Sequence, residues 1–69
     1  MKLSARNVLK GRMVQVIRGQ TTAHVKIDVG GGSVVTASIT VEAVDEMNLR
    51  EGDAAYAIIK ASNVIIGAD

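Results

Sequence analysis

The sequence predicts an all-β domain, a five-stranded Greek-key barrel with one short helix between its third and fourth strands. Hydrophobic residues make up 48% of the 69 residues and are mostly small or β-branched aliphatics, which favour strands. Apolar and polar residues also alternate in two stretches, and glycine-containing or polar connectors separate the apolar segments. A pair of packed sheets forming a sandwich is the alternative arrangement of the same elements.

The first three strands are expected over residues 8–18, 23–29 and 35–39. Gly11 interrupts the first of these, which is typical of a bulge or of a close approach between two backbones. The second alternates most regularly, so one of its faces should be buried and the other exposed. The glycines at 30–32 permit the positive φ angles of a hairpin turn between the second and third strands.

The pattern changes period after the third strand. Val41, Val44 and Met47 lie three residues apart, which suits one or two turns of helix. Thr40 is a suitable N-cap for that helix because its hydroxyl can accept a hydrogen bond from a backbone N–H of the first turn.

Two further strands are expected at residues 54–59 and 64–66. The segment 54–59 is apolar on both of its faces, so we expect a second subunit to cover the face that the domain itself leaves open. The element order then matches the oligonucleotide/oligosaccharide-binding (OB) barrel.

Composition favours an oligomer and excludes several functions. Tyr56 is the only aromatic residue and cysteine is absent, so a single core would be thin and no thiol chemistry is available. Eight basic and seven acidic residues leave a net charge of +1, which does not indicate binding to nucleic-acid phosphates. No apolar run approaches the ~20 residues of a membrane helix, and the N-terminus does not resemble a secretory signal. We therefore expect a cytoplasmic protein.

The residues do not indicate an enzyme. His24 is the only histidine and lies on the polar face of the second predicted strand. The serines lack a nucleophile-elbow pattern, and the glycine triplet lacks the lysine of a phosphate loop. The carboxylates match no calcium-loop spacing, so we expect a solvated acidic face and no site for a free metal cation; these are Glu42, Asp45, Glu46, Glu51 and Asp53.

Two short polar segments, one near each end of the chain, share a donor set. Residues 4–7 read Ser-Ala-Arg-Asn and residues 60–63 read Lys-Ala-Ser-Asn, so each has one cation and one serine two positions apart. A tetrahedral dianion is bound by such groups, because cations offset its charge while hydroxyls and backbone N–H groups saturate its oxygens. Exposed surface charge beside a turn explains the same residues, and spacing alone favours that explanation.

Four segments resemble the molbindins, small molybdate-binding proteins built from one Mop domain. They read SARNVLKG, ITVEAV, LREGD and IIKASNVII, in that order over the whole chain. The resemblance implies an OB barrel assembled as a hexamer, a trimer of dimers, with oxyanion pockets between subunits. It also implies that residues 1–69 form one Mop domain of the free-standing type, with no DNA-binding or ATPase partner domain.

The resemblance implies a ligand set for the main pocket: Ser4, Ala5 (through its N–H), Arg6, Lys60, Ala61 and Ser62. Ala43 stands where the family often has serine, so Thr40 is a candidate for the missing hydroxyl. A second type of pocket, near a symmetry axis, could be built by Gln20, Thr21 and Thr22; a plain exposed connector is the other interpretation of this loop.

We therefore expect a protein that binds molybdate, and tungstate as well, for intracellular storage and molybdenum homeostasis, with no reaction and no cofactor. Two alternatives belong to other classes. A single-strand nucleic-acid binder on the same barrel requires stacking aromatics and a basic groove, which this composition does not supply. A purely structural assembly module predicts an oligomer that is indifferent to oxyanions.

Overall fold

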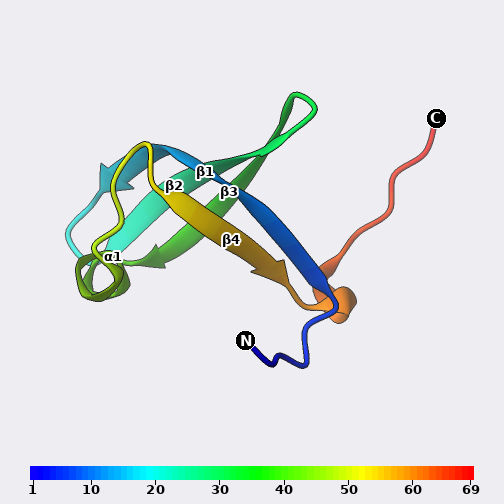
Figure 1. Cartoon of the computed structure of the whole chain (residues 1–69), viewed down its shortest axis with the longest axis horizontal. Helices are drawn as coiled ribbons and strands as arrows, with labels where there is room; N and C mark the ends of the chain where they lie inside the picture. Colours follow the sequence, from blue (N-terminus) through cyan, green and yellow to red (C-terminus); the bar gives the residue numbers. More distant parts are fainter.

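The computed structural model describes residues 1–69 and contains one antiparallel sheet with a short helix at one end (Figure 1). The order of the strands across the sheet is β3-β2-β1-β4, so β3 and β4 are its two edges. The elements are β1 (Asn7–Arg18), β2 (Thr22–Gly30), β3 (Ser33–Thr40), α1 (Val41–Met47), β4 (Ala54–Ile59) and the single 3₁₀ turn η1 (Ala61–Asn63). No helix is long and apolar enough to span a membrane.

Strand β1 is long and pairs with a different partner along each half. Its first half, from Asn7 to Arg12, pairs with β4, and its second half pairs with β2. Gly11 lies where the two pairings meet, and a Cβ atom there would stand 2.4 Å from the backbone oxygen of Asp28. Gly11 therefore permits the close backbone approach that the sequence predicts, and the bulge itself falls between Met13 and Gln15.

The hairpin between β2 and β3 and the helix both form where the sequence predicts them. Gly30, Gly31 and Gly32 have φ angles of 95°, 61° and 82°, a region that favours glycine. Thr40 caps α1, and its Oγ1 accepts a hydrogen bond of 3.0 Å from the N–H of Ala43. Asn48 ends the helix in the left-handed conformation, with φ 51°.

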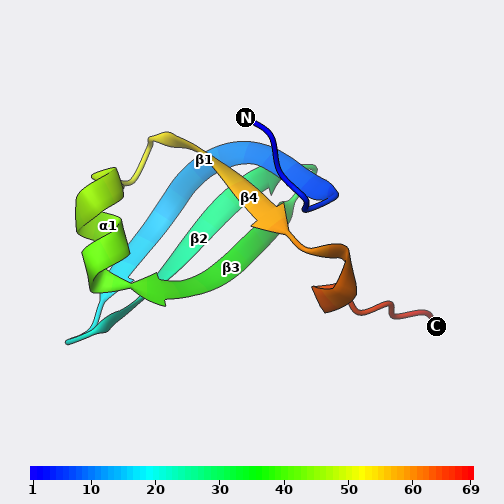
Figure 2. The same ribbon diagram turned by 90° about the horizontal axis from the view of Figure 1, so that it is seen from below.

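The core is small because one curled sheet and one short helix enclose it (Figure 2). Six residues are buried, all of them apolar: Met13, Ala23, Val25, Ile27, Val44 and Ala57. Strand β4 contributes only Ala57 to this group, while Tyr56 and Ile58 on its other face remain exposed. The chain itself thus leaves one face of β4 uncovered.

The predicted fifth strand is wrong for the isolated chain. Residues 64–66 form no strand, and the sheet has four strands in an open curl instead of five in a closed barrel. A strand needs a neighbouring backbone to pair with, and η1 turns the chain away from the sheet before residue 64, so the tail extends outward (Figure 1). The aliphatic composition of the tail is typical of a strand, but its own chain supplies no partner.

Candidate functional site

The start of β1 and the end of β4 lie side by side, and they bring the two polar segments together. Asn7 is paired with Ile59 in the sheet. Arg6 directly precedes Asn7 and Lys60 directly follows Ile59, so both segments leave the sheet at the same end of the β1–β4 pair. In Figures 1 and 2 the N-terminal segment and η1 are neighbours at this end. The two candidate half-sites, 53 or more residues apart in sequence, are therefore adjacent in space.

The side chain of Asn7, as well as its backbone, holds the start of β1 against the end of β4. Its Nδ2 donates a hydrogen bond of 3.1 Å to the backbone oxygen of Ile59, in a partly buried position. This contact positions Arg6 and Lys60 relative to each other, and the sequence did not indicate it. The only signal was the place of Asn7 inside the Ser-Ala-Arg-Asn segment, which does not distinguish a ligand from a residue that holds the ligands in place.

The two cations at the junction are exposed and have no carboxylate partner. The ion pairs of the molecule join Arg18 to Asp45, at 2.7 Å, and Arg50 to Asp53, at 3.8 Å. Arg6 and Lys60 take part in neither pair, and residues 1–10 and 54–68 contain no acidic side chain. Their positive charge is therefore available to an anion, and no acid in these segments would repel it.

The backbone around Lys60 also offers donors. Lys60 is extended, and η1 begins at Ala61 with bonds from the N–H of Asn63 to the oxygen of Lys60 and from Val64 to Ala61. A single turn of this kind leaves its first N–H groups, those of Ala61 and Ser62, without a partner inside the turn. Ser4 and Ser62 are exposed, so their hydroxyls face solvent and can donate to a bound anion.

Thr40 lies away from this junction, at the opposite end of the sheet. It pairs with Thr22 at the start of β2 and caps α1. Its hydroxyl accepts from the N–H of Ala43 and still has a proton to donate. Within one chain, Thr40 is not placed beside the residue 4–6 and 60–62 segments, so a pocket containing all of them would need residues from two copies of the chain.

The predicted second set of ligands lies in the connection between β1 and β2 and at the first residue of β2, close to Thr40. Gln20, Thr21 and Thr22 are all exposed. The N–H of Gly19 bonds to the oxygen of Thr22 at 2.8 Å, and the N–H of Val41 bonds to the oxygen of Thr21 at 2.9 Å. A backbone hydrogen bond therefore joins the loop to the start of α1, and the three polar side chains face solvent.

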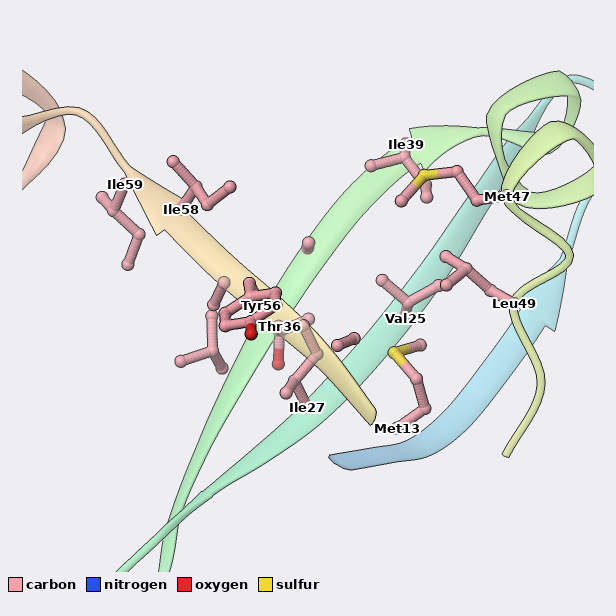
Figure 3. Close-up of a pocket in the computed structure, with 14 residues that line it drawn as sticks. Met13, Val25, Ile27, Thr36, Ile39, Met47, Leu49, Tyr56, Ile58 and Ile59 are labelled. Carbon is pink, nitrogen blue, oxygen red and sulfur yellow. The ribbon is translucent and has the colours of Figure 1, made fainter. Parts of the chain in front are cut away.

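The one pocket of the molecule is an apolar groove with no charged side chain to bind an anion; the hydroxyls in its lining are those of Thr36 and Tyr56. It has a volume of about 460 Å³ and lies between β3 and β4, with hydrophobic residues at 13 of its 14 lining positions. Figure 3 shows Ile39, Met47, Leu49, Tyr56 and Ile58 around it. No group of three or more histidine, aspartate or glutamate side chains is placed to hold a metal ion.

The comparison with known proteins decides the family. Residues 3–66 match the model of the TOBE domain. The chain belongs to the TOBE domain family. This TOBE domain is 49% identical, over 69 residues and 100% of both chains, to a probable molybdenum-pterin-binding protein of Haemophilus influenzae.

Two solved structures share the fold of this TOBE domain. MopII from Clostridium pasteurianum, in an apo form, has a TM-score of 0.90 at 37% identity, covering 97% of this chain and 100% of that one. The cytoplasmic molybdate-binding protein ModG, solved with molybdate bound, has a TM-score of 0.95 at 43% identity, covering 100% of this chain and 49% of that one. The resemblance to molbindins that the sequence predicted is thus confirmed, together with a small all-β fold containing one short helix.

Proposed function

We propose that this TOBE domain binds molybdate without any reaction, and that residues 4–6 and 60–62 hold the anion. The observation that carries the proposal is the Asn7–Ile59 pairing, which brings two cations without an ion-pair partner and two serine hydroxyls to one end of the β1–β4 pair, on segments that contain no acidic residue. The names of the relatives support a molybdenum-containing ligand, since one is a probable molybdenum-pterin-binding protein, and the structure of ModG with molybdate bound supports molybdate itself.

Each proposed ligand has a distinct role. Arg6 presents a rigid fork of donors that suits two oxygens of a tetrahedral anion, and Lys60 adds a movable point charge. Together they offset the charge of a dianion. The hydroxyls of Ser4 and Ser62 and the N–H groups of Ala5 and Ala61 bind the remaining oxygens without adding charge.

The pocket is proposed to be completed between subunits of a hexamer, a trimer of dimers. The distance of Thr40 from residues 4–6 within one chain supports this, because a shared pocket would require a second copy to bring its hydroxyl to the anion. Gln20, Thr21 and Thr22 form a second anion site in the same proposal, where three copies of the loop meet at a symmetry axis. Their exposure and lack of charge are compatible with such a site.

We further propose that residues 1–69 act as one Mop domain that stores or buffers the oxyanion in the cytoplasm. Tungstate is expected to bind at the same place, because it has the same charge and shape as molybdate. The description of ModG as cytoplasmic supports this location.

Isothermal titration calorimetry with molybdate, tungstate and sulfate tests the proposed function. We expect saturable binding of molybdate and tungstate at micromolar protein, and weaker binding of sulfate because its smaller radius leaves some donors out of reach. Absence of molybdate binding under conditions in which the protein is folded would refute the proposal.

A further inference from the structure

The charges of the chain are segregated along it, although their sum is only +1. Residues 1–27 contain no acidic side chain and hold six of the eight cations: Lys2, Arg6, Lys10, Arg12, Arg18 and Lys26. Of these six, only Arg18 takes part in an ion pair. The net charge therefore understates the positive potential at the end of the sheet where β1 begins (Figure 1).

Lys10 is the cation of β1 that lies closest to the proposed anion pocket. It is paired with Tyr56 of β4, three pairs along the ladder from Asn7 and Ile59. At a strand rise of about 3.3 Å per residue, its Cα lies roughly 10 Å from that of Asn7. At this separation Lys10 is outside the proposed ligand set, but its charge still acts on a dianion through the solvent.

The side chain of Lys10 is exposed and has no carboxylate beside it. Side chains of a strand alternate between its two faces, and the buried Ala57 opposite Leu9 marks the core face, so Lys10 lies on the solvent face. Lys10 takes part in neither ion pair of the molecule, and the residue pairs on either side of it are uncharged. Its charge is therefore not neutralised by a neighbour.

Beyond Lys10 the charges of the sheet become mixed. Arg12 is paired with Asp28 on its β2 side, and Asp53 directly precedes its β4 partner, Ala54. The guanidinium of Arg12 also donates a hydrogen bond of 2.7 Å to the backbone oxygen of Gly52. Along the β1–β4 pair, the region without acids thus extends from the proposed pocket past Lys10 and ends at Arg12.

We propose that Lys10 attracts the molybdate dianion to the pocket through its electrostatic field, without contacting it. The proposal rests on the proposed function and adds a charge to those of the ligands Arg6 and Lys60. A positive charge near a pocket raises the local concentration of an anion and stabilises the anion once it is bound. Salt weakens this attraction, because the Debye length falls from about 30 Å at 0.01 M to about 8 Å at 0.15 M ionic strength.

Charge reversal at Lys10, measured at two ionic strengths, tests the proposal. Isothermal titration calorimetry with molybdate compares Lys10→Glu with the natural chain at each ionic strength. Screened Coulomb interaction with a dianion in water predicts an affinity loss of about 4- to 8-fold at 0.01 M and only about 2-fold at 0.15 M. Lys10→Gln removes the charge without reversing it and should lose about 2- to 3-fold at 0.01 M.

Lys26→Glu is the matched control. Lys26 is also an exposed strand cation, but it is paired with Gln15, eight positions along β1 from Asn7 (residues 7 to 15). At a separation of roughly 26 Å, the same charge reversal is expected to change the affinity by about 2-fold or less at 0.01 M. Circular dichroism and sedimentation compare the fold and assembly of each variant with those of the natural chain, and Lys10→Gln decides the test if Lys10→Glu does not fold.

Two results would overturn the proposal. Equal losses for the Lys10 and Lys26 variants at 0.01 M would show that position on the sheet does not matter. An equal loss for the Lys10 variants at both ionic strengths would identify Lys10 as a direct ligand, because contacts are screened much less than distant charges. The natural chain separates this inference from the proposed function: if it binds no molybdate, both fail, and if it binds as tightly as the Lys10 variants, only the inference fails.

Discussion

At the scale of single residues, Asn7 explains how an ordinary surface serine and arginine become half of a candidate site. Its backbone is paired with Ile59 in the sheet and its side chain donates a hydrogen bond to the oxygen of Ile59, so the segments that follow on from this pair are held at one end of the sheet. The residue types of the site could be predicted from sequence, because the donor sets at 4–6 and 60–62 are alike. The closeness of the two segments in space could not be predicted, because it depends on a pairing between residues 52 positions apart.

Removing either cation should weaken molybdate binding and leave the fold intact. Arg6→Ala and Lys60→Ala each remove a charge-assisted hydrogen bond, which is typically worth ~1.5–3 kcal/mol, or about 10- to 150-fold in affinity. Calorimetry measures the change. Lys26→Ala is the matched control, since Lys26 is an exposed cation in the middle of β2. Equal affinities for all three variants would rule out the assigned ligands.

Gly11 should be far less tolerant of a methyl group than Gly67. In Gly11→Ala the new Cβ would lie 2.4 Å from the backbone oxygen of Asp28, so the β1 and β2 backbones must move apart. We expect a loss of ~1–3 kcal/mol in the free energy of unfolding, measured by urea denaturation. Gly67→Ala serves as the control because no atom lies within 4 Å of its Cβ position. Similar stability of the two variants would show that the close approach is not a constraint.

At the scale of elements, the local sequence pattern predicted each element correctly where that element finds its hydrogen-bonding partners within the chain. The alternation in β2, the glycine hairpin and the threonine cap at α1 are all decided by neighbouring residues, and all three were predicted. Residues 64–66 carry an equally clear strand composition but form no strand. Propensity indicates what a segment is able to form, whereas the hydrogen-bonding partner decides whether it does so.

Thr40 caps the helix and is also a proposed ligand of the anion, and these two roles can be separated. Thr40→Ala removes the cap on the N–H of Ala43 and should lower the free energy of unfolding by ~1 kcal/mol. Thr40→Ser keeps the hydroxyl and should retain most of the stability. If Thr40 also reaches the anion from a second copy, Thr40→Ala will weaken molybdate binding and Thr40→Ser will not. A variant with lower stability but unchanged affinity would limit Thr40 to capping.

At the scale of the whole molecule, a single chain leaves much of its hydrophobic surface exposed to solvent. Six residues are buried, while an apolar groove, one face of β4 and an aliphatic tail are exposed. Small domains bury a modest share of their surface, and association is a common way to bury more. Thr40 is also separated from residues 4–6 within one chain. The proposed site therefore depends on how copies of the chain pack, which the sequence does not show.

Stability should therefore depend on protein concentration. If unfolding is coupled to dissociation, mass action raises the unfolding temperature as concentration increases. Differential scanning calorimetry over a hundredfold range of concentration is expected to show a steady rise of several degrees. A constant unfolding temperature across that range would mean that the isolated chain is stable by itself.

The most direct test of the central claim is the anomalous signal of tungsten in a crystal soaked with tungstate. It locates the anion independently of affinity and shows its ligands together. We predict a peak within hydrogen-bonding distance of Ser4, Arg6, Lys60 and Ser62, where the start of β1 meets the end of β4. A peak elsewhere with this junction empty, or no peak in a well-ordered crystal, would contradict the proposed site.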